Sequence, residues 1–440
     1  MQLLSLLVVA ILCNYAFSLH STSSFRFKSV GVSKSNLKYA NPVLNSFSIE
    51  ELIAALKNKG VDVSNVKIPQ IEYNKGGPLT DLVYITKEAC DILSPMVTAF
   101  YEKISQGYGG GAQKIKSDAT YFTIADGIVQ HLLIAHLFGG NKFHQIVGEE
   151  DESKINIITK PFMVDELEVP EEFVDIVEST RDKIRMLANR IDSNKYKELT
   201  LFVDPIDGTR EFATGKGECC SILVGFNDAK GSAVAGMIYR PLTSPPTWAA
   251  GAASENCRLG VLDKPVKANP NGLLITDTEP TKFITTLINE LGYEKIPSLA
   301  SGNRVLMLIE GKGGAYIRDT GGNAKWDTCA PQAVLDAYGG VLVKLSSFIK
   351  DQSLENYTYL KAESNLDFEP NKVTLTLSNA KDKSKFKKGE TVIVSDVKDI
   401  KPYSNVQGLL ALDHNNLDDL DRIHAAILKM KKDGIPPLYT

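Results

Sequence analysis

Two carboxylates three positions apart, Asp204 and Asp207, lie where residue types and spacing best suit chemistry. They follow a short apolar run, flank a proline, and are succeeded at once by Gly208 and Thr209. A strand that ends on Asp204, turns through Ile206 and opens a helix at Gly208 would gather two acidic side chains, a free carbonyl, a hydroxyl and helix N–H groups. Because hard divalent cations bind such oxygens and phosphate binds helix starts, this turn predicts a cation site able to receive phosphate.

Three further acidic residues lie in or at the end of apolar stretches, where their side chains could point into a shared cleft: Asp126, Glu149 and Asp327. A single aspartate at a helix start is most simply an N-cap. Together with the Asp204–Asp207 pair in the DPIDGT turn, these three residues make four acidic places in the sequence, which favours a shared site instead. The elements that carry them must therefore converge on the turn.

Hydrophobic periodicity and capping signals predict alternating helices and strands around these residues. Helices are expected over residues 48–59, 79–107, 123–138, 171–190, 281–291, 304–310, 327–338 and 417–431. Strands are expected over residues 146–147, 199–203, 221–226, 233–239, 273–275, 315–317 and 409–411. Pro95 predicts a kink or a break near Ser94, and residues 346–401 are typical of an insertion of hairpins.

The bulk composition is that of a globular protein, with 440 residues, 43% of them apolar and 23% charged. This length fits two domains, or one large two-part α/β unit, with ample core. The formal net charge of −4 provides no basic field, so a nucleic-acid polymer is not an expected partner. A phosphate group would be held locally, by metal and a few basic side chains.

The six cysteines do not suggest a disulfide framework or a zinc site. One, Cys13, lies in the N-terminal apolar run, and the chain contains no CxxC pair. Cys219 and Cys220 are adjacent, and adjacent cysteines rarely bridge each other. We expect reduced thiols that pack as small apolar residues, with a redox sensor at Cys219 and Cys220 as the alternative.

The first 45 residues are typical of a targeting leader. Leu3–Leu12 suits the apolar core of a signal peptide, and no Asp or Glu occurs from Met1 to Ile49. This composition predicts entry to the secretory pathway followed by a plastid-type organelle, with a plain secretory signal and a linker as the alternative. No membrane span is expected in the mature protein. The basic residues of this segment are Arg26, Lys28, Lys34 and Lys38.

Three segments with these acidic residues resemble a known family: VGEED at 147–151, DPIDGTREF at 204–212 and KWDTCAPQAVLDAYGG at 325–340. The family comprises the lithium-sensitive, magnesium-dependent phosphomonoesterases related to inositol monophosphatase. Within it, GNRVLMLIEGKGGAY at 302–316 followed by KWDTCAP is most similar to the 3′(2′),5′-bisphosphate nucleotidase branch. The resemblance extends over residues 80–430, broken by inserts.

The resemblance implies an α/β fold, the layered αβαβα sandwich of the inositol monophosphatase and fructose-1,6-bisphosphatase type. After the leader at 1–45, an α+β lobe would span 46–265 and an α/β lobe 266–440. The metal motifs would lie mainly in the first lobe, and the substrate contacts and the KWD motif in the second. The active site would lie between the two lobes.

The resemblance also implies two Mg²⁺ ions. Glu149, Asp204 and the carbonyl of Ile206 would hold the first ion. Asp204, Asp207 and Asp327 would hold the second, so that Asp204 bridges the pair. A third, looser ion near Glu149 is compatible with the pattern.

The same resemblance pairs Asp126 with Thr209 to orient and deprotonate an attacking water. A phosphate monoester carries its own negative charge, so cations must neutralise it and lower the pKa of the water. Thr209 is no strong base, but it can relay a proton when it is hydrogen-bonded to Asp126. The N–H groups of Gly208 and Thr209 would receive phosphate oxygens.

Three residues of the second lobe would contact the substrate's second phosphate and nucleoside: Ser301, Arg304 and Arg318. The nucleotidase pattern has a lysine where this chain has Arg304, and arginine keeps the charge while adding a fork suited to phosphate. Glu279 stands about where related nucleotidases carry a histidine near the base or ribose. This chain therefore differs from the nucleotidase pattern at the residue expected to contact adenine. The alternative for Arg304 and Arg318 is a surface salt bridge.

The activity implied is Mg²⁺-dependent hydrolysis of the 3′-phosphate of adenosine 3′,5′-bisphosphate, a small-molecule phosphate ester. The related 3′-phosphoadenosine 5′-phosphosulfate would be a second substrate, and Li⁺ an inhibitor. One alternative is an inositol polyphosphate 1-phosphatase, which shares the metal motifs. Another is a secreted Ca²⁺-binding protein, which would need no Asp126–Thr209 pair. The sequence does not indicate an oligomeric state.

Overall fold

The computed structural model describes residues 76–105, 113–115, 121–150, 154–265, 267–275, 280–320, 323–360, 373–375, 392–394 and 400–437. All of them belong to one unit of the chain, Tyr73–Thr440. The leader at 1–45, the helix expected at 48–59 and Glu279 lie outside the described residues. Those expectations stay predictions, as does the division into lobes at residue 265.

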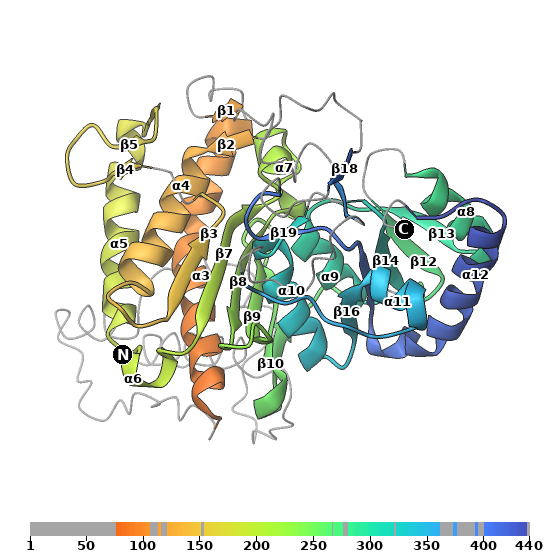
Figure 1. Ribbon diagram of the computed structural model, residues 1–440. Coiled ribbons are helices and arrows are strands. Elements are labelled where there is room, and N and C mark those ends of the chain that lie inside the picture. The colour runs from red at the N-terminus through yellow and green to blue at the C-terminus, as the bar shows by residue number, and fades with distance from the viewer. Residues whose placement is uncertain are drawn as a thin grey trace, which may run out of the picture. The chain divides into compact units, whose positions relative to one another are not determined.

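A six-stranded sheet forms the first half of the unit, in the order β11-β10-β9-β8-β7-β3 (Figure 1). Only β3 and β7 run parallel, and the other neighbours are antiparallel. Every residue of β7 and β8 is buried, as expected for central strands covered on both faces. The strands are β3 (Gln145–Gly148), β7 (Thr200–Asp207), β8 (Ser221–Asn227), β9 (Ala233–Arg240), β10 (Thr247–Ala252) and β11 (Cys257–Val261).

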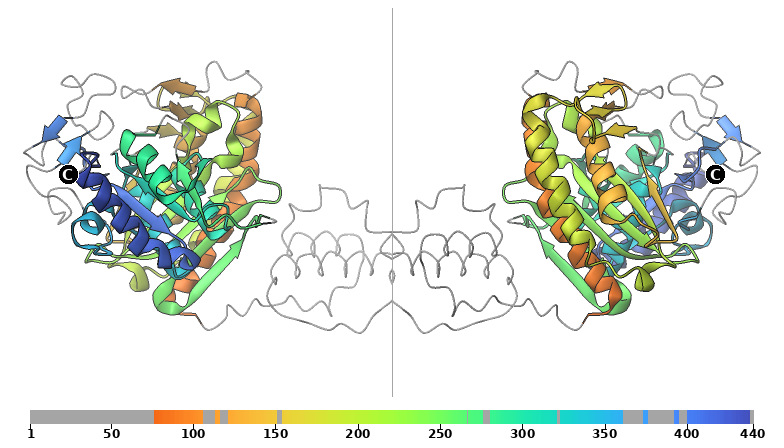
Figure 2. Two further views of the ribbon diagram at one scale, coloured as in Figure 1. Left: turned by 90° about the vertical axis from the view of Figure 1, so that its right-hand side faces the viewer. Right: turned by 90° about the vertical axis from the view of Figure 1, so that its left-hand side faces the viewer.

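Long helices cover one face of this sheet, seen as orange and yellow ribbons in Figure 2. They are α3 (Pro78–Lys103), α4 (Ile124–His131), which continues as the π-helix η4 (Leu132–Leu137), and α5 (Val174–Ala188). Pro95 lies inside α3, which is assigned as helix without a break, so the break expected near Ser94 does not occur. Within the described residues, no helix has the length and apolar character needed to cross a membrane.

A five-stranded sheet forms the second half, in the order β13-β12-β14-β20-β16. β12 pairs parallel with β13 and β14, whereas β20 is antiparallel to β14 and β16. The strands are β12 (Gly272–Ile275), β13 (Glu294–Pro297), β14 (Ala315–Arg318), β16 (Val341–Lys344) and β20 (Leu409–Leu412).

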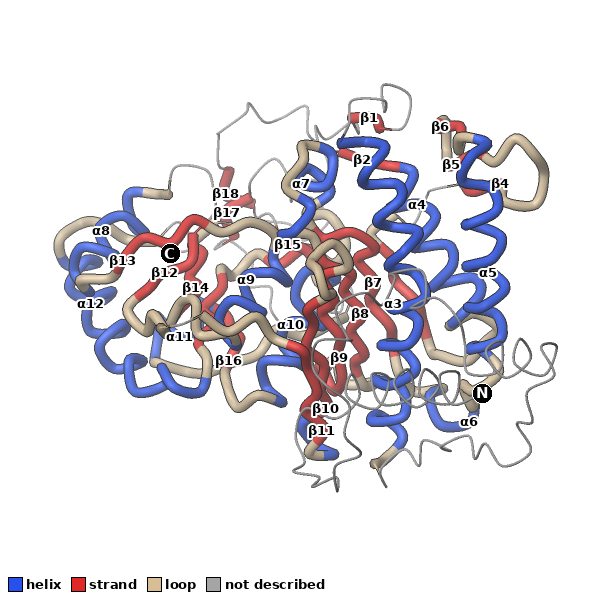
Figure 3. Tube along the Cα trace, turned by 180° about the vertical axis from the view of Figure 1, so that it is seen from behind, coloured by secondary structure: helices blue, strands red, loops and turns tan. Residues whose placement is uncertain are grey.

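Helices α9 (Ser301–Ile309) and α10 (Trp326–Ala337) lie between the two sheets (Figure 3). α10 packs against β8, β9 and β10 on one side and contacts β16 on the other. This approach requires glycine, because a Cβ added at Gly225 would lie 2.6 Å from the Ala330 nitrogen and one at Gly236 would lie 2.7 Å from the Ala330 oxygen.

The outer face of the second sheet is covered by α8 (Lys282–Leu291), α11 (Leu345–Asp351) and α12 (Leu420–Lys432). Their apolar side chains join those of β12, β14, β16 and β20 in one core cluster. A second cluster fills the space between the sheets, and a third lies under α3, α4 and α5. The order helix, sheet, helix, sheet, helix confirms the expected layered α/β fold.

Small elements complete the described chain. The short helices are η5 (Glu171–Phe173), α6 (Ser193–Tyr196), α7 (Thr209–Ala213), η6 (Gly217–Cys219), η7 (Ala253–Glu255) and η11 (His414–Asp419). The short strands are β1 (Gln113–Ile115), β2 (Tyr121–Thr123), β4 (Ile155–Asn156), β5 (Met163–Val164), β6 (Leu167–Glu168), β15 (Asn323–Ala324), β17 (Val373–Leu375), β18 (Val392–Val394) and β19 (Ser404–Asn405).

Several sequence expectations about these elements are wrong. β7 does not stop at Asp204 but continues to Asp207, and α9 begins at Ser301, three residues before the expected start. Residues 345–351 form a helix where hairpins were expected, although β17 and β18 do pair antiparallel. Among the strands of the two large sheets, β10, β11, β13 and β16 were not predicted.

The first turn of α3 is capped from far along the chain. Glu255, at the end of η7, accepts hydrogen bonds from the backbone nitrogens of Leu79 (3.0 Å) and Thr80 (2.7 Å) and from the Thr80 hydroxyl (2.7 Å). The local N-cap residue, Gly77, offers no side chain. A carboxylate there also suits the positive end of the helix dipole.

We therefore expect Glu255→Ala to destabilise the protein by about 1 kcal/mol, the usual cost of losing an N-cap, and to lower its melting temperature. Glu255→Gln should retain part of this stability because an amide oxygen can still accept one of the bonds. The matched control is Glu198→Ala, which removes an exposed glutamate. Equal melting temperatures for the Glu255 and Glu198 variants, measured by calorimetry, would contradict the capping role.

Candidate active site

The parallel pair β3 and β7 brings two of the predicted acidic residues to one edge of the first sheet. Gly148 pairs with Val203, and the backbone nitrogen of the next residue, Glu149, donates to the Val203 carbonyl at 3.0 Å. Glu149, at the carboxyl end of β3, therefore lies beside Asp204, in the carboxyl-terminal half of β7. Ligand sites of α/β sheets commonly lie at such ends.

An irregularity in β7 determines how its two aspartates are directed. Asp204 pairs with Leu223 and Asp207 with Ser221, so three steps along β7 oppose two steps along β8. Residues three apart in a regular strand lie on opposite faces of the sheet. The extra residue cancels that alternation, as β-bulges near active sites do, so both carboxylates can serve one site.

The carboxylate of Asp207 is held by three donors. The backbone nitrogens of Ser301 (3.0 Å) and Gly302 (2.6 Å), in the first turn of α9, and the hydroxyl of Ser221 (3.0 Å) all donate to it. The preceding residue, Ala300, has φ 58° and ψ 144°. Such a conformation costs a non-glycine residue about 1–3 kcal/mol, and it directs the start of α9 at Asp207.

The third aspartate comes from the other side of the site. Asp327 lies in the first turn of α10, and its Oδ2 accepts from the backbone nitrogen of Ala324 at 2.5 Å. One carboxylate oxygen from each of Asp204, Asp207 and Asp327 lies within 4.8 Å of the others. Asp204 Oδ1 is buried and has no hydrogen-bond partner among the described residues.

These surroundings raise the pKa of all three aspartates. For Asp204 the first cause is burial, followed by the negative charges of Glu149 and Asp207. Burial also raises the pKa of Asp207 in spite of its three donors. Burial and the charge of Asp207 raise the pKa of Asp327 to about 7.

The donor set fits a hard divalent cation. All the gathered side-chain atoms are carboxylate oxygens, which Mg²⁺ prefers, and buried carboxylates this close are stable together only with protons or a cation between them. The orphaned Oδ1 of Asp204 is an acceptor that such an ion would satisfy. The predicted ligands Asp204, Asp207 and Asp327 are thus brought together. Of the other two predicted ligands, Glu149 follows the neighbouring strand β3, and Ile206 immediately precedes Asp207 in β7.

The predicted pair Asp126 and Thr209 is also brought together. Thr209 Oγ1 lies 2.9 Å from Asp126 Oδ1 and 3.0 Å from the carbonyl of Ile206. The hydroxyl has one hydrogen and can donate to only one of them at a time. The other carboxylate oxygen of Asp126, a fully buried side chain, accepts from Thr123 Oγ1 (2.5 Å) and the Thr123 nitrogen (3.0 Å) in a capping box at the start of α4.

Gly208 adopts a left-handed conformation, φ 95°, as the N-cap of α7. A Cβ at this position would lie 3.1 Å from that of Ala300, so the turn favours glycine on two grounds. The thiol of Cys220 donates to the Gly208 carbonyl at 3.2 Å. Burial raises the pKa of both Cys219 and Cys220, which favours packing over the redox alternative; all five cysteines in the described part of the chain are free.

The predicted substrate contacts lie beside the aspartates, but their side chains are directed inward. Arg304 is 5% exposed and donates from Nε (3.2 Å) and Nη2 (3.0 Å) to Ser298 and from Nη1 to the Tyr316 hydroxyl (3.4 Å). Arg318 donates to Thr320 and Asn323. Burial excludes a surface salt bridge for Arg304, and contact of either arginine with a second phosphate stays a prediction.

Sequence reasoning missed the residues that hold these groups. Thr123 was available from the TIAD segment, because Thr-x-x-Asp before an apolar run is a capping-box signal. Ser221 follows from pairing the two predicted strands around the turn. The backbone donors of Gly302 and Ala324, and the buried Tyr316 with its arginine neighbours, carry no local signal.

Comparison with known proteins agrees with this geometry. Residues 81–363, well over half of the chain, match the Inositol monophosphatase family. The chain belongs to the inositol monophosphatase family. It is therefore an enzyme of a phosphatase family.

Its relatives include two nucleotidases and an inositol phosphatase. The chain is 29% identical to 3′(2′),5′-bisphosphate nucleotidase 1 of Rattus norvegicus, over 55% of this chain and 77% of the relative. It is 27% identical to the protein of that name in Dictyostelium discoideum, over 52% and 75%. It is 23% identical to inositol polyphosphate 1-phosphatase of Mus musculus, over 54% and 76%.

Solved structures of the same kind are also similar. The suhB protein of Bartonella henselae is 12% identical, with a TM-score of 0.43 over 78% of this chain and 98% of that one. Inositol monophosphatase from Anabaena is 13% identical, with a TM-score of 0.42 over 82% and 99%.

We expect Mg²⁺ to bind more tightly as the pH rises from 6 to 8. A proton on Asp327, whose pKa is about 7, must leave before the ion binds, so affinity should fall about tenfold per pH unit below that pKa. Titration calorimetry in buffers with different ionisation heats would count the released protons. Equal affinity at pH 6 and pH 8, with no proton release, would contradict the prediction.

The metal-free protein should show the opposite trend in stability. A carboxyl group whose pKa is raised on folding, here from 3.8 to about 7, keeps its proton in the folded state longer than in the unfolded state. Its contribution is present below about pH 4 and is lost as the pH rises through 7. The melting temperature without Mg²⁺ should fall over this range, and Asp327→Asn should flatten the fall.

Proposed function

We propose that this chain is a Mg²⁺-dependent phosphomonoesterase that removes the 3′-phosphate of adenosine 3′,5′-bisphosphate, giving AMP and phosphate. The hydrogen bond between Thr209 and Asp126, 2.9 Å long and beside three clustered aspartates, carries this proposal. A protein that only sequesters cations would need neither residue. The sulfated relative 3′-phosphoadenosine 5′-phosphosulfate is proposed as a second substrate, and Li⁺ as an inhibitor.

Two metal ions would be held by the acidic cluster and its neighbours. Their ligands would be Glu149, Asp204, the Ile206 carbonyl, Asp207 and Asp327, in the arrangement predicted from the sequence. When bound, the ions would neutralise phosphate charge and lower the pKa of the attacking water. The raised pKa of the aspartates supports the proposal, because burial and mutual repulsion destabilise their negative charges and a bound cation would stabilise them.

The chain's own residues would move the proton. Thr209 donates its hydrogen to Asp126 Oδ1, which leaves its oxygen lone pairs free to accept a hydrogen bond from water. As that water attacks phosphorus, its proton passes to Thr209 Oγ1 and the Thr209 proton passes to Asp126. The bonds from Thr123 hold the second oxygen of Asp126 and so fix the direction of the first.

The choice of a nucleotide over an inositol phosphate rests on the relatives. The proteins named 3′(2′),5′-bisphosphate nucleotidase 1 are 27–29% identical over 50–60% of this chain. Inositol polyphosphate 1-phosphatase is 23% identical, and putative inositol monophosphatase 3 of Drosophila melanogaster is 28% identical over 34% of this chain. The positive charges of Arg304 and Arg318 act on Asp207 and Asp327, and they favour a bisphosphate, whether nucleotide or inositol, over a monophosphate.

Phosphate release should identify the substrate. With Mg²⁺ present, we expect kcat/KM for adenosine 3′,5′-bisphosphate to exceed that for inositol 1,4-bisphosphate by at least about tenfold, a difference of about 1.4 kcal/mol in transition-state binding. Chelation of Mg²⁺ should abolish both reactions. Equal or greater turnover of the inositol substrate would refute the nucleotidase assignment, and metal binding without any phosphate release would favour a cation-binding protein.

Removing the proton relay should lower kcat without removing the metal site. Asp126→Asn and Thr209→Val should each reduce kcat by about 10²–10⁴-fold, the usual contribution of a positioned acid or base. Mg²⁺ affinity, measured by calorimetry, should change little. The matched control is Asp192→Asn, because the Asp192 carboxylate also caps a helix, α6, but belongs to neither the acidic cluster nor the Asp126–Thr209 pair. Full activity of Asp126→Asn would contradict the water-activation role.

A further inference from the structure

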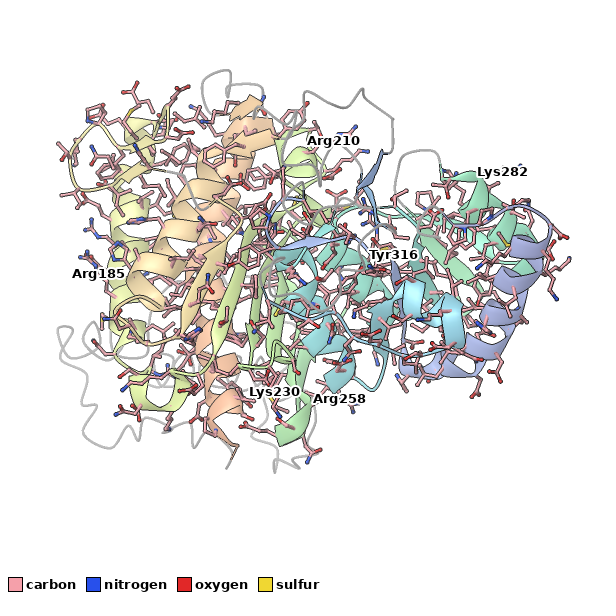
Figure 4. The ribbon with its side chains drawn as sticks, in the orientation of Figure 1. Arg185, Arg210, Lys230, Arg258, Lys282 and Tyr316 are labelled. Carbon is pink, nitrogen blue, oxygen red and sulfur yellow. The ribbon has the colours of Figure 1, made fainter. Side chains whose placement is uncertain are left out.

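A buried tyrosine links the two arginines beside the acidic cluster. Tyr316 lies on β14 and is 2% exposed, inside the second half of the unit (Figure 4). Two residues on, Arg318 belongs to the same face of the strand, because side chains alternate along a strand. Arg304 reaches this face from α9, which packs on β14.

The contacts of Arg304 fix it against the tyrosine. Nη1 donates to the Tyr316 hydroxyl at 3.4 Å, and the guanidinium carbon lies 5.1 Å from the ring centroid. Two further hydrogen bonds of Arg304 go to Ser298 and leave the side chain little rotational freedom. The side chain of Arg318 also lies within hydrogen-bonding reach of the phenol.

The electrostatics of Tyr316 agree with this geometry. Burial alone would raise the pKa of the phenol, but the positive charges of Arg304 and Arg318 outweigh it, so the pKa of Tyr316 is lowered. Two guanidinium groups repel each other, and an oxygen that accepts from both offsets this repulsion. The phenol therefore acts as a hydrogen-bond acceptor shared by two cations.

The same group of residues contains a donor without a hydrogen bond of standard geometry. Arg318 donates to the Oδ1 of Asn323, whereas the buried Asn323 Nδ2 makes no hydrogen bond of standard geometry within the described structure and has only the Tyr316 phenol nearby. Asn323 is 7% exposed and immediately precedes Ala324, whose nitrogen holds Asp327. An unsatisfied buried amide beside two arginines is a site that an anionic ligand would complete.

We propose that Tyr316 is a positioning residue for the second phosphate of the substrate. Its phenol oxygen holds Arg304 and Arg318 in one arrangement, so that their charge and the Asn323 amide are directed at the same anion. This inference rests on the proposed function, because only a bisphosphate substrate has a second phosphate. It assigns Tyr316 no part in the proton transfer at Thr209.

The test is the variant Tyr316→Phe, which removes the oxygen and keeps the ring. We expect KM for adenosine 3′,5′-bisphosphate to rise about tenfold, as for loss of a hydrogen bond to a charged group, with kcat changed less than about twofold. KM for adenosine 3′-monophosphate, which lacks the second phosphate, should not change. Tyr316→Met, which also lacks the oxygen and fills the space flexibly, should reproduce this pattern if Tyr316→Phe folds poorly.

A double-mutant cycle tests whether Tyr316 acts through an arginine. In an Arg318→Met background, Tyr316→Phe should no longer raise KM for the bisphosphate. Tyr293→Phe is the matched control, because Tyr293 is a buried tyrosine that donates to Asp419 at 2.7 Å, on the outer side of the second sheet. It should keep wild-type KM for both nucleotides.

Three results would overturn the inference. An unchanged KM for the bisphosphate in both Tyr316 variants would remove the positioning role. Equal rises in KM for both nucleotides would indicate general damage to the site. Additive effects in the cycle would show that Tyr316 does not act through Arg318. If the wild-type protein releases phosphate from neither nucleotide, the proposed function itself fails, and that failure is recognised before any variant is made.

Discussion

The mutual repulsion of three close carboxylates, two of them buried and one half-buried, is the constraint on which the rest of the structure depends. Asp204, Asp207 and Asp327 lie within 4.8 Å of one another, and two unit charges at about 4 Å repel by about 4 kcal/mol near a protein surface. Backbone N–H donors to Asp207 and Asp327 offset part of this repulsion. A site that is costly to leave empty is also one that binds a cation strongly.

The layered architecture allows such a cluster to form. The first sheet alone does not supply all three aspartates, because Asp204 and Asp207 lie in β7 whereas Asp327 lies in the first turn of α10. α9 and α10 lie between the sheets, and the first turn of each faces the end of β7. Both helices pack in the core. At their N-termini, α9 provides two backbone N–H donors to Asp207, and α10 provides the carboxylate of Asp327.

Sequence patterns predicted the parts of the site that are local. The motifs around Asp204 and Asp327 needed no knowledge of the fold. The capping-box spacing of Thr123 and Asp126 was missed, although it is equally local. Contacts between distant segments were not predictable in this way. Glu255 caps a helix 176 residues away, and Ala300 adopts its strained conformation at the point where α9 meets Asp207. Nothing near either residue in the sequence indicates these roles, because tertiary packing imposes them.

The irregular pairing of β7 has a consequence for how this protein can vary. Because three residues of β7 oppose two of β8, the direction of Asp207 depends on the number of residues between the aspartates as well as on their identity. A regular strand with the same three-residue spacing would turn one carboxylate to the opposite face of the sheet. The spacing of the two aspartates and the irregularity in β7 must therefore change together if both carboxylates are to stay on one face.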